Sequence, residues 1–350
     1  MATIRLPNSG PDGPRKGAIV AMTPRVTLMF PGQGAQHRRM AAGLYRHEPV
    51  FTEVLDETLA AYGDQGAMLR ALWLNPDPAV SIDATVPAQG LLFAVDYALG
   101  RMVLSWGVRP AVLLGHSVGE VVAATIAGVF DPAEICALLV ERTKRLADGP
   151  AGGMLAVAAT PSELACYLDD HIQVGAHNAR RQTVLAGPEQ ALAAVQKQLC
   201  ADGYVCRPIA AQTPFHSSAI AGLAEETALL FASIRLQPPK IPVLSAYTGH
   251  FLSAEEARNP DYWAIQPAEP VLFWPTLQTL LASGDHLLIE AGPSQGLSTA
   301  VRTHPSVRAG RTTVFPVLPP RQGRPEADRS AVRAVRAQLA NQGLLTTEPV

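Results

Sequence analysis

Residues 115–119 read Gly-His-Ser-Val-Gly and follow the pattern G-x-S-x-G. This pentapeptide lies between an apolar run over residues 111–115, which predicts a buried strand, and residues 120–129, which predict a helix. Its glycines permit a tight turn that projects the Ser117 hydroxyl, and the start of the helix supplies N–H groups and a positive dipole end. A serine hydroxyl is a weak nucleophile unless a base lies within hydrogen-bond reach. The pattern predicts a serine nucleophile, with a glycine-rich turn around an incidental serine as the alternative.

The elements that must position this serine alternate along the chain between strands and helices. An apolar run over residues 25–30 ends in Pro-Gly-Gln-Gly at 31–34, which is typical of a strand that leads into a tight turn. We expect a large α/β body with a parallel sheet. Its expected strands lie at residues 25–30, 111–115, 241–245 and 287–290, and its expected helices at 40–61, 87–106, 120–129 and 133–146.

A second pattern interrupts this body after the glycine-rich residues 149–153. The expected order of strand, helix, strand, strand, helix and strand is typical of a small ferredoxin-like subdomain. Its strands are expected at 154–159, 172–176, 182–186 and 204–209, and its helices at 161–168 and 189–201. The predicted organisation is a flexible tail over 1–23, a large subdomain over 24–150 and 212–320, the small subdomain over 151–211, and a C-terminal helix and tail over 321–350.

The composition excludes several classes of protein. The chain of 350 residues carries 28 basic and 30 acidic side chains, a net charge of −2, so no overall positive field attracts nucleic acid. Hydrophobic residues make up 48% of the chain, but no apolar run approaches the roughly 18 residues of a membrane-spanning helix. Four cysteines without a C-x-x-C pair indicate reduced thiols. We expect a cytoplasmic monomer with no metal, no bound cofactor and no nucleic-acid or membrane partner.

Several separated motifs resemble, in the same order, those of a known family. They are PGQGAQ at residues 31–36, AQ at 88–89 with LFAVDYAL at 92–99, GHSVGE at 115–120, Arg142, GM at 153–154, FHS at 215–217, YW at 262–263, PV at 270–271 and EAGP at 290–293. Together they resemble bacterial malonyl-CoA:acyl carrier protein transacylases and the acyltransferase domains of polyketide synthases, from about Val26 to about Gly343. The resemblance implies an α/β-hydrolase-like large subdomain with a parallel sheet and an inserted ferredoxin-like small subdomain.

The resemblance also implies a role for each matching residue. Ser117 is the nucleophile that takes an acyl group from a pantetheine thioester, and His216 is the general base. In place of the acid of a catalytic triad, the backbone carbonyl of Gln266 orients His216. An acceptor at one ring nitrogen fixes the tautomer at the other, as the acid of a triad does. The backbone N–H groups of Gln33 and Val118 form the oxyanion hole.

Two residues bear on the acyl group. Arg142 lies 25 residues after Ser117 on a predicted helix, where the resembling proteins hold the carboxylate of their substrate with an arginine. A surface arginine, as neighbouring Arg145 suggests, is the alternative. Phe215 resembles the malonyl type, in which a bulky side chain fills the space of an α-methyl group. Thr213 and Pro214 depart from the His-Ala of that motif.

Other polar residues have weaker assignments. His116 supports the nucleophile turn, and Asn178 is a candidate for a hydrogen bond near the substrate. The pairs Arg38-Arg39 and Arg180-Arg181 are candidate docking points for an acidic carrier protein or for CoA phosphates, with an ordinary solvated face as the alternative.

These residues predict a discrete acyltransferase that acts in polyketide biosynthesis. A CoA thioester donates a malonyl group to Ser117, and the phosphopantetheine thiol of an acyl carrier protein accepts it in a ping-pong sequence. A thioester-editing hydrolase and a transferase between two carrier proteins remain as alternatives on the same fold. A non-catalytic carrier-docking module is disfavoured because Ser117, His216 and Arg142 are all present.

Overall fold

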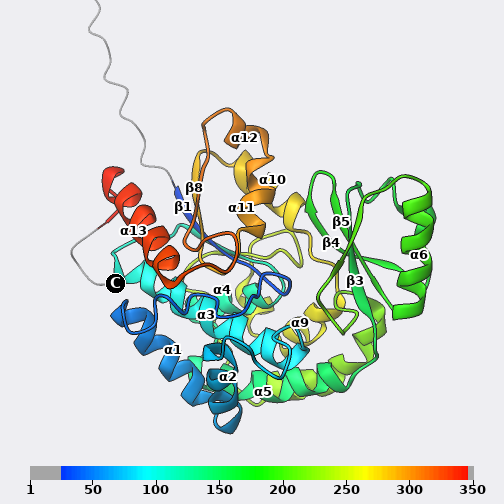
Figure 1. Ribbon diagram of the computed structural model, residues 1–350, viewed down its shortest axis with the longest axis horizontal. Coiled ribbons are helices and arrows are strands. Elements are labelled where there is room, and N and C mark those ends of the chain that lie inside the picture. Colours follow the sequence, from blue (N-terminus) through cyan, green and yellow to red (C-terminus); the bar gives the residue numbers. More distant parts are fainter. Residues whose placement is uncertain (1–24, 346–350) are drawn as a thin grey trace, which may run out of the picture.

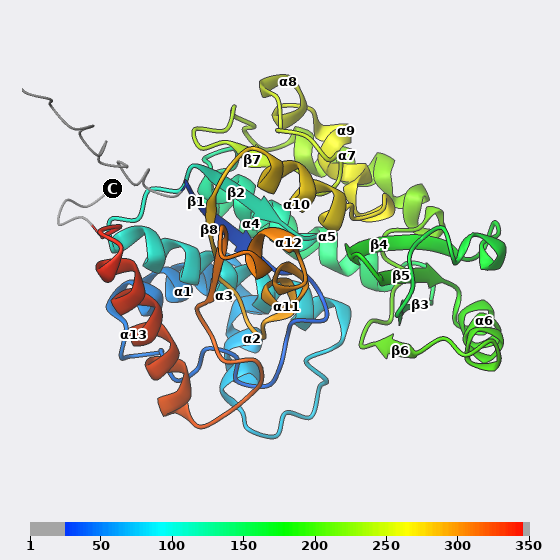
Figure 2. The same cartoon turned by 90° about the horizontal axis from the view of Figure 1, so that it is seen from above.

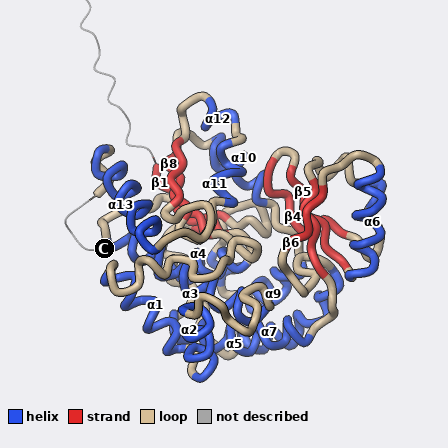
Figure 3. Tube along the Cα trace, in the orientation of Figure 1, coloured by secondary structure: helices blue, strands red, loops and turns tan. Residues whose placement is uncertain are grey.

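The computed structural model describes residues 25–345, so the predicted tail over 1–23 and the last residues, 346–350, lie outside the described range. A larger body holds one sheet, and a smaller body at one end of the molecule holds a second sheet (Figures 1 and 3). The C-terminal helix α13 lies on the side of the larger body that is remote from the smaller one (Figure 1).

The sheet of the larger body is parallel throughout and has the strand order β7-β2-β1-β8-β9. Its strands are β1 (Arg25–Phe30), β2 (Val112–Gly115), β7 (Val243–Leu244), β8 (His286–Glu290) and β9 (Thr313–Pro316). In the register of β1 with β2, Phe30 lies opposite Gly115. The loops that follow these two strands therefore begin side by side at the carboxyl edge of the sheet, where open α/β sheets place their sites.

Helices cover both faces of this sheet (Figure 2). Successive side chains of a strand point to opposite faces. Accordingly, Leu28 and Phe30 of β1 join the larger hydrophobic cluster, which includes much of α1, α3, α4 and α5, whereas Met29 joins a second cluster with residues of α10 and α11. Strands buried on both faces are mostly apolar. β2 is apolar throughout, and β1 is apolar except for its exposed first residue, Arg25, and the buried Thr27.

The structure describes thirteen α-helices between residues 25 and 345. They are α1 (Pro49–Ala61), α2 (Asp64–Leu74), α3 (Thr85–Ser105), α4 (Val118–Ile126), α5 (Pro132–Asp148), α6 (Glu189–Ala201), α7 (Ala224–Ala232), α8 (Ala254–Ala257), α9 (Pro260–Ile265), α10 (Phe273–Ala282), α11 (Gly296–Arg302), α12 (Pro305–Arg308) and α13 (Pro325–Asn341). None of these helices is long and apolar enough to cross a membrane.

The smaller sheet is antiparallel and has the order β4-β5-β3-β6. Its strands are β3 (Gly153–Val157), β4 (Gln173–Ala179), β5 (Gln182–Gly187) and β6 (Cys206–Ile209). One face packs on α6 through Leu155 and Val157, and the other packs through Met154 and Ala156 on the cluster that contains α10. The predicted fold class, a parallel α/β body with an inserted ferredoxin-like unit, is confirmed.

Backbone hydrogen bonds attach the smaller sheet to the larger body. The N–H of Val271 donates to the carbonyl of Gly175 (2.9 Å), and the N–H of His177 donates to the carbonyl of Val271 (2.8 Å). Val271 lies just before α10, so strand β4 is held by the same segment that leads into the larger body.

Two predicted helices are shorter in the structure. Residues 40–47 form turns instead of the start of a helix, because Gly43 lies against α13: its N–H donates to Asp328 (2.9 Å), and a Cβ there would lie 2.2 Å from the Pro325 carbonyl oxygen. The expected helix over 161–168 is reduced to turns and a 3₁₀ segment, Ala165–Tyr167. Asp169 accepts hydrogen bonds from the N–H groups of His171 and Ile172, a local turn that competes with helix.

Gly119 provides a test of how closely α4 packs on β1. A Cβ at this position would lie 2.2 Å from the carbonyl oxygen of Phe30, and backbone cannot move aside as a side chain can. We expect Gly119→Ala to lower the free energy of unfolding by about 1–3 kcal/mol, as for overpacked cores, in urea denaturation. The control is Gly222→Ala, where nothing lies within 4 Å of the added Cβ. Equal denaturation midpoints for the two variants would refute this close packing.

Candidate active site

The nucleophile turn has a backbone conformation that its glycines make possible. Ser117 has φ 57° and ψ −119°, values rarely adopted by a residue with a side chain, and it directly precedes α4. A Cβ at Gly115 would lie 2.2 Å from the backbone nitrogen of Glu120. The turn between β2 and α4 is therefore as tight as the sequence pattern predicts, and the Ser117 side chain projects from its apex.

Ser117 and His216 form a hydrogen-bonded pair although 99 residues separate them in the sequence. The Nε2 atom of His216 lies 2.7 Å from the Oγ atom of Ser117. The Nδ1 atom lies 2.7 Å from the backbone carbonyl oxygen of Glu269, which can only accept a hydrogen bond. Nδ1 therefore carries the proton, and Nε2 is free to accept the proton of the Ser117 hydroxyl.

The turn that begins at Gln266 faces His216 as expected, and the shortest contact to the ring comes from a carbonyl three residues further along. The resemblance placed the orienting role on Gln266, whereas the 2.7 Å contact of Nδ1 is made by Glu269, at the end of the short 3₁₀ turn Gln266–Ala268. This turn directs its carbonyls towards His216, and the backbone N–H of His216 donates to the carbonyl of Pro267 (2.6 Å). The Glu269 carbonyl is the one that lies opposite the ring nitrogen.

Burial determines the protonation state of His216. Its side chain is buried, and desolvation lowers its pKa to about 3. The charge of Arg142 and the nearby ring of His116 lower it further, and hydrogen bonds to the carbonyls of Glu269 and Gln266 oppose the shift. The imidazole is therefore neutral at physiological pH, the form that a proton acceptor requires.

The loop after β1 lies directly against the nucleophile turn. A Cβ added to Gly32 would lie 2.4 Å from the carbonyl oxygen of His116 and 3.0 Å from the Cβ atom of Ser117. Gln33 is held in place because its Oε1 atom accepts a hydrogen bond from Gln89 of α3 (2.8 Å). Val118 is the first residue of α4, where N–H groups have no helical carbonyl to bond. The backbone groups expected to form the oxyanion hole thus belong to two adjoining segments.

Arg142 is a buried cation beside this pair. Its side chain is only 4% exposed, and no Asp or Glu among residues 25–345 forms a salt bridge with it. Desolvation lowers its pKa to about 10, which still leaves it charged at neutral pH. Its Nε atom has no hydrogen-bond partner in the described part of the chain, and its NH2 group donates a long bond (3.4 Å) to Gln266.

The side chain of Gln266 connects Arg142 to the nucleophile turn. Its Nε2 atom donates to the backbone carbonyl of Ser117 (3.0 Å), while its Oε1 atom accepts from Arg142. Sequence analysis assigned a role only to the backbone of this residue. Its side-chain role was missed because a buried amide that bridges two distant segments leaves no pattern in one sequence. The structure gives its side chain a place in the site.

Three further predicted residues lie near the reacting pair. Phe215 is buried beside Leu146 and Ala268, next to His216. The Nε2 atom of His116 lies 2.8 Å from the Oδ1 atom of Asn178, so the structure joins the two residues of the weaker assignments. Burial lowers the pKa of His116, which favours the neutral ring with its proton on the nitrogen that faces Asn178.

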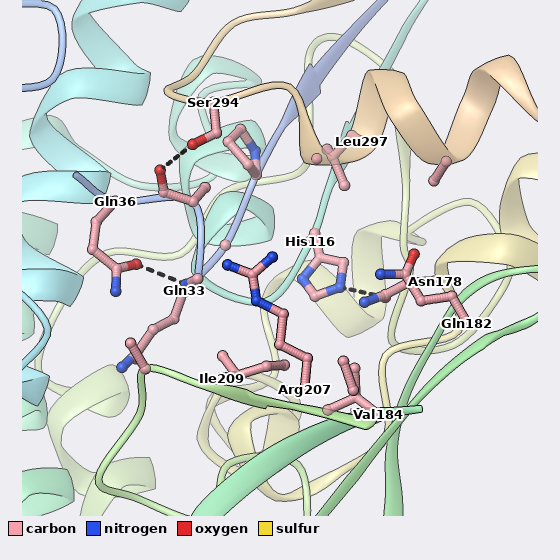
Figure 4. Close-up of a pocket in the computed structure, with 18 of the residues that line it drawn as sticks. Gln33, Gln36, His116, Asn178, Gln182, Val184, Arg207, Ile209, Ser294 and Leu297 are labelled. Atoms are coloured by element: carbon pink, nitrogen blue, oxygen red, sulfur yellow. Dashed lines mark hydrogen bonds between the residues drawn. The ribbon is translucent and has the colours of Figure 1, made fainter. Parts of the chain in front are cut away.

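A cavity of about 520 Å³ borders the nucleophile turn through Gln33 and His116, and we call it the active-site cavity. Figure 4 shows its walls: Gln33, Gln36 and Ser294 from the larger body lie opposite Val184 and Ile209 of the smaller sheet, and His116 lies between them. The side chain of Arg207 extends from β6 into the cavity, a feature that the sequence did not predict (Figure 4).

Behind the nucleophile turn lies a polar cluster that sequence reasoning also missed. The Oε1 atom of the fully buried Glu120 lies 2.5 Å from the Oγ atom of Ser245 and 3.0 Å from the hydroxyl of Tyr262. Desolvation raises the pKa of Glu120 to about 7, although hydrogen bonds from Ser245 and Tyr262 oppose this shift. Glu120 and Tyr262 both belong to motifs of the resemblance, which was the available signal.

Comparison with known proteins identifies the class that this geometry defines. The acyl transferase domain family matches residues 27–342, and the chain belongs to that family. The predicted family is thereby confirmed, and with it the assignment of the chain to the acyltransferases.

Similar proteins come from polyketide synthesis. The chain is 33% identical over 307 residues to a phenolphthiocerol/phthiocerol polyketide synthase of Mycobacterium tuberculosis, and the match covers 88% of this chain but 21% of that protein. The chain thus spans about a fifth of the length of that curated relative.

Solved structures share the fold. The acyltransferase domain from the second module of the salinomycin polyketide synthase is 31% identical, with a TM-score of 0.82 over 95% of this chain and 77% of that one. A malonyl transacylase in complex with its type II polyketide synthase acyl carrier protein is 23% identical, with a TM-score of 0.77 over 90% of this chain and 99% of that one. The latter likeness supports the fold alone.

The low pKa of His216 predicts an unusual pH dependence. The reaction of Ser117 with a fluorophosphonate probe is expected to keep its rate as pH falls through 6.5, the ordinary histidine pKa, because the ring stays neutral towards about pH 3. The folded state binds this proton less readily than the unfolded chain, so His216 costs stability as pH falls from 6.5 towards 3. Labelling rates between pH 4 and 8 test the first statement, and a half-maximal rate near pH 6.5 would contradict it.

The raised pKa of Glu120 predicts that its contribution to stability decreases as pH rises, the opposite of the dependence expected for His216. The folded state binds this proton more tightly than the unfolded chain, so stability is lost as pH rises from 4.5 through about 7. Glu120→Gln retains an oxygen that can accept hydrogen bonds but cannot ionise. Between pH 5 and pH 8.5 the free energy of unfolding of the variant should therefore fall by about 2–3 kcal/mol less than that of the parent. Urea denaturation at both pH values measures this difference, and parallel losses would show that Glu120 is ionised throughout.

Proposed function

We propose that this acyltransferase moves a malonyl group from a CoA thioester to the phosphopantetheine thiol of an acyl carrier protein, through an ester on Ser117, in polyketide biosynthesis. The proposal draws on the Ser117–His216 pair, on the buried Arg142, and on the names of the similar proteins. Donor and acceptor are both pantetheine thioesters or thiols, so one cavity serves both half-reactions.

In the first half-reaction, the Oγ atom of Ser117 attacks the thioester carbonyl while its proton passes to Nε2 of His216. The negative charge that develops on the carbonyl oxygen is stabilised by backbone N–H groups of Gln33 and Val118, donors that need no reorganisation during the step. The intermediate collapses as the C–S bond breaks, and the proton on Nε2 passes to the departing CoA sulfur. The products are free CoA and a malonyl ester of Ser117.

The second half-reaction reverses these roles. The neutral Nε2 of His216 takes the proton of the carrier's thiol, and the sulfur attacks the ester carbonyl. The Ser117–acyl bond breaks, the proton returns to Oγ, and the malonyl group leaves on the carrier. The Glu269 carbonyl keeps the Nδ1 proton in place in both halves, so the same tautomer serves both directions.

The observation that carries the choice of acyl group is the isolated charge of Arg142. A buried guanidinium without an anion costs several kcal/mol of desolvation, and a carboxylate in the site would offset this cost with a two-pronged ion pair. A malonyl group brings such a carboxylate, whereas an acetyl group does not. Phe215 lies beside the reacting pair and is placed to occupy the space that an α-substituent would need.

Mass spectrometry of the intact protein tests the proposal. Incubation with malonyl-CoA is expected to add one malonyl group to the protein, and Ser117→Ala is expected to abolish the addition. Arg142→Ala should lower kcat/KM for malonyl-CoA about 100-fold, because one partner of a buried pair is lost, while kcat/KM for acetyl-CoA falls much less. The matched control is Arg145→Ala on the same helix, whose guanidinium pairs with Glu226 at the surface.

Three results would overturn the proposal or a part of it. If the protein loads acetyl-CoA and malonyl-CoA equally, the carboxylate role of Arg142 is wrong. If the acyl group leaves as free malonate in the presence of a phosphopantetheinylated carrier protein, the enzyme is a thioester hydrolase. If Ser117→Ala still acquires the malonyl group, the nucleophile is another residue.

A further inference from the structure

A second cavity of about 540 Å³ lies between the smaller sheet and the helices α10 and α12 of the larger body. It shares Ala156, Gln182 and Arg207 with the wall of the active-site cavity, so the two cavities adjoin along the smaller sheet. We call this second cavity the arginine groove. Its lining residues are Ala156, Val157, Ala158, Ala179, Arg180, Arg181, Gln182, Val205, Arg207, Trp274, Thr303, Pro305 and Arg308.

The charges of the arginine groove are all positive. Arg180, Arg207 and Arg308 form no salt bridge and no side-chain hydrogen bond with another residue of the range 25–345. Arg181 differs, because it is paired with Glu163 at 2.9 Å. The net charge of the whole chain is only −2, so this group of uncompensated cations is a local feature and not part of a basic surface.

These three arginines come from three separate elements. Arg180 lies in the turn between β4 and β5, Arg207 lies on β6, and Arg308 is the last residue of α12. Arginines from both bodies therefore converge on one cavity that adjoins the active-site cavity. The guanidinium of Arg207 points towards Gln33 and His116 at the junction of the two cavities (Figure 4).

From this convergence we propose that the arginine groove binds the phosphorylated nucleotide half of the CoA donor, its adenosine 3′-phosphate and diphosphate. Guanidinium groups recognise phosphates by paired hydrogen bonds, and CoA carries three phosphate groups beyond its pantetheine arm. The inference rests on the proposed function, since the thioester end of the same donor would occupy the active-site cavity.

The shape of the groove favours a nucleotide over a carrier protein. Its volume of about 540 Å³ lies in the range of small-molecule sites, which are concave and roughly 300–1,000 Å³. A folded carrier protein would bind a broader surface and would bring a single phosphodiester at the end of its pantetheine arm. The apolar floor formed by Ala156, Ala158 and Val205 can contact the adenine ring and the ribose.

This assignment gives the two substrates different contacts. Donor and acceptor share the pantetheine arm, so the active-site cavity cannot distinguish them. Only the donor has a nucleotide. The groove would therefore raise the affinity for acyl-CoA and leave the affinity for the carrier's pantetheine arm unchanged. Because the arginines are exposed, their effect should weaken as salt is added.

The decisive experiment compares malonyl-CoA with malonyl-pantetheine, which has the same arm and no phosphate. In Arg180→Gln/Arg308→Gln, KM for malonyl-CoA is expected to rise about tenfold, allowing for two solvent-screened contacts, while KM for malonyl-pantetheine changes less than about twofold. The parent protein should prefer malonyl-CoA to malonyl-pantetheine, and this preference should shrink in the variant. Arg329→Gln on the remote helix α13 is the matched control and should alter neither KM.

A binding measurement separates failure of this inference from failure of the proposed function. Calorimetric titration of Ser117→Ala with CoA and with 3′-dephospho-CoA needs no turnover, and both ligands should bind more weakly to Ser117→Ala/Arg180→Gln/Arg308→Gln. Equal CoA affinity of the two proteins would overturn the inference even if acyl transfer is confirmed. A variant that is slowed only in malonyl transfer to the carrier protein would also overturn it, since the groove would then belong to the carrier.

Discussion

The site depends on one close contact, the packing of the nucleophile turn against the carboxyl end of β1. Gly32, Gly115 and Gly119 permit this contact, because a Cβ at each would lie 2.2–2.4 Å from a backbone atom of the facing segment or turn. The contact places the loop after β1 beside Ser117, and the oxyanion donors, the Gln33–Gln89 bond and the junction with the cavity all follow from it. A larger residue at Gly32 or Gly119 would push the nucleophile turn away from the end of β1, and one at Gly115 would open the turn itself.

A second constraint is electrostatic. His216 and Arg142 are both buried within the same small volume, and the charge of Arg142 helps to keep the histidine neutral. The site thus holds one permanent cation and one neutral acceptor of protons. This division suits a proposed substrate that brings a fixed negative charge to one end and needs proton transfer at the other.

Much of this could be predicted from the sequence, and the omissions have physical causes. The strand over 25–30, the Ser117 turn and the separation of the chain into two sheets follow from apolar periodicity and glycine placement, which are local signals. Ser117 was recognised from its pentapeptide, and His216 and Arg142 from the ordered motifs that the chain shares with a known family. The role of orienting His216 was assigned to the carbonyl of Gln266, whereas the 2.7 Å contact to Nδ1 comes from Glu269. Every residue has a carbonyl, so only the path of the turn decides which one faces Nδ1. The reach of Arg207 into the cavity depends likewise on how two sheets are docked, which no local pattern encodes.

The attachment of β4 to Val271 has a mechanical consequence. Val271 follows the turn that holds both the backbone and the ring of His216, and it also pairs with Gly175 and His177 of the smaller sheet. The smaller sheet is therefore linked by hydrogen bonds to the turn that holds His216, and Gln266 of the same turn also bonds to the carbonyl of Ser117 (3.0 Å). One short segment, residues 266–271, thus holds the proposed base, the nucleophile turn and the smaller sheet in register. A substitution that alters the path of this segment would disturb all three at once.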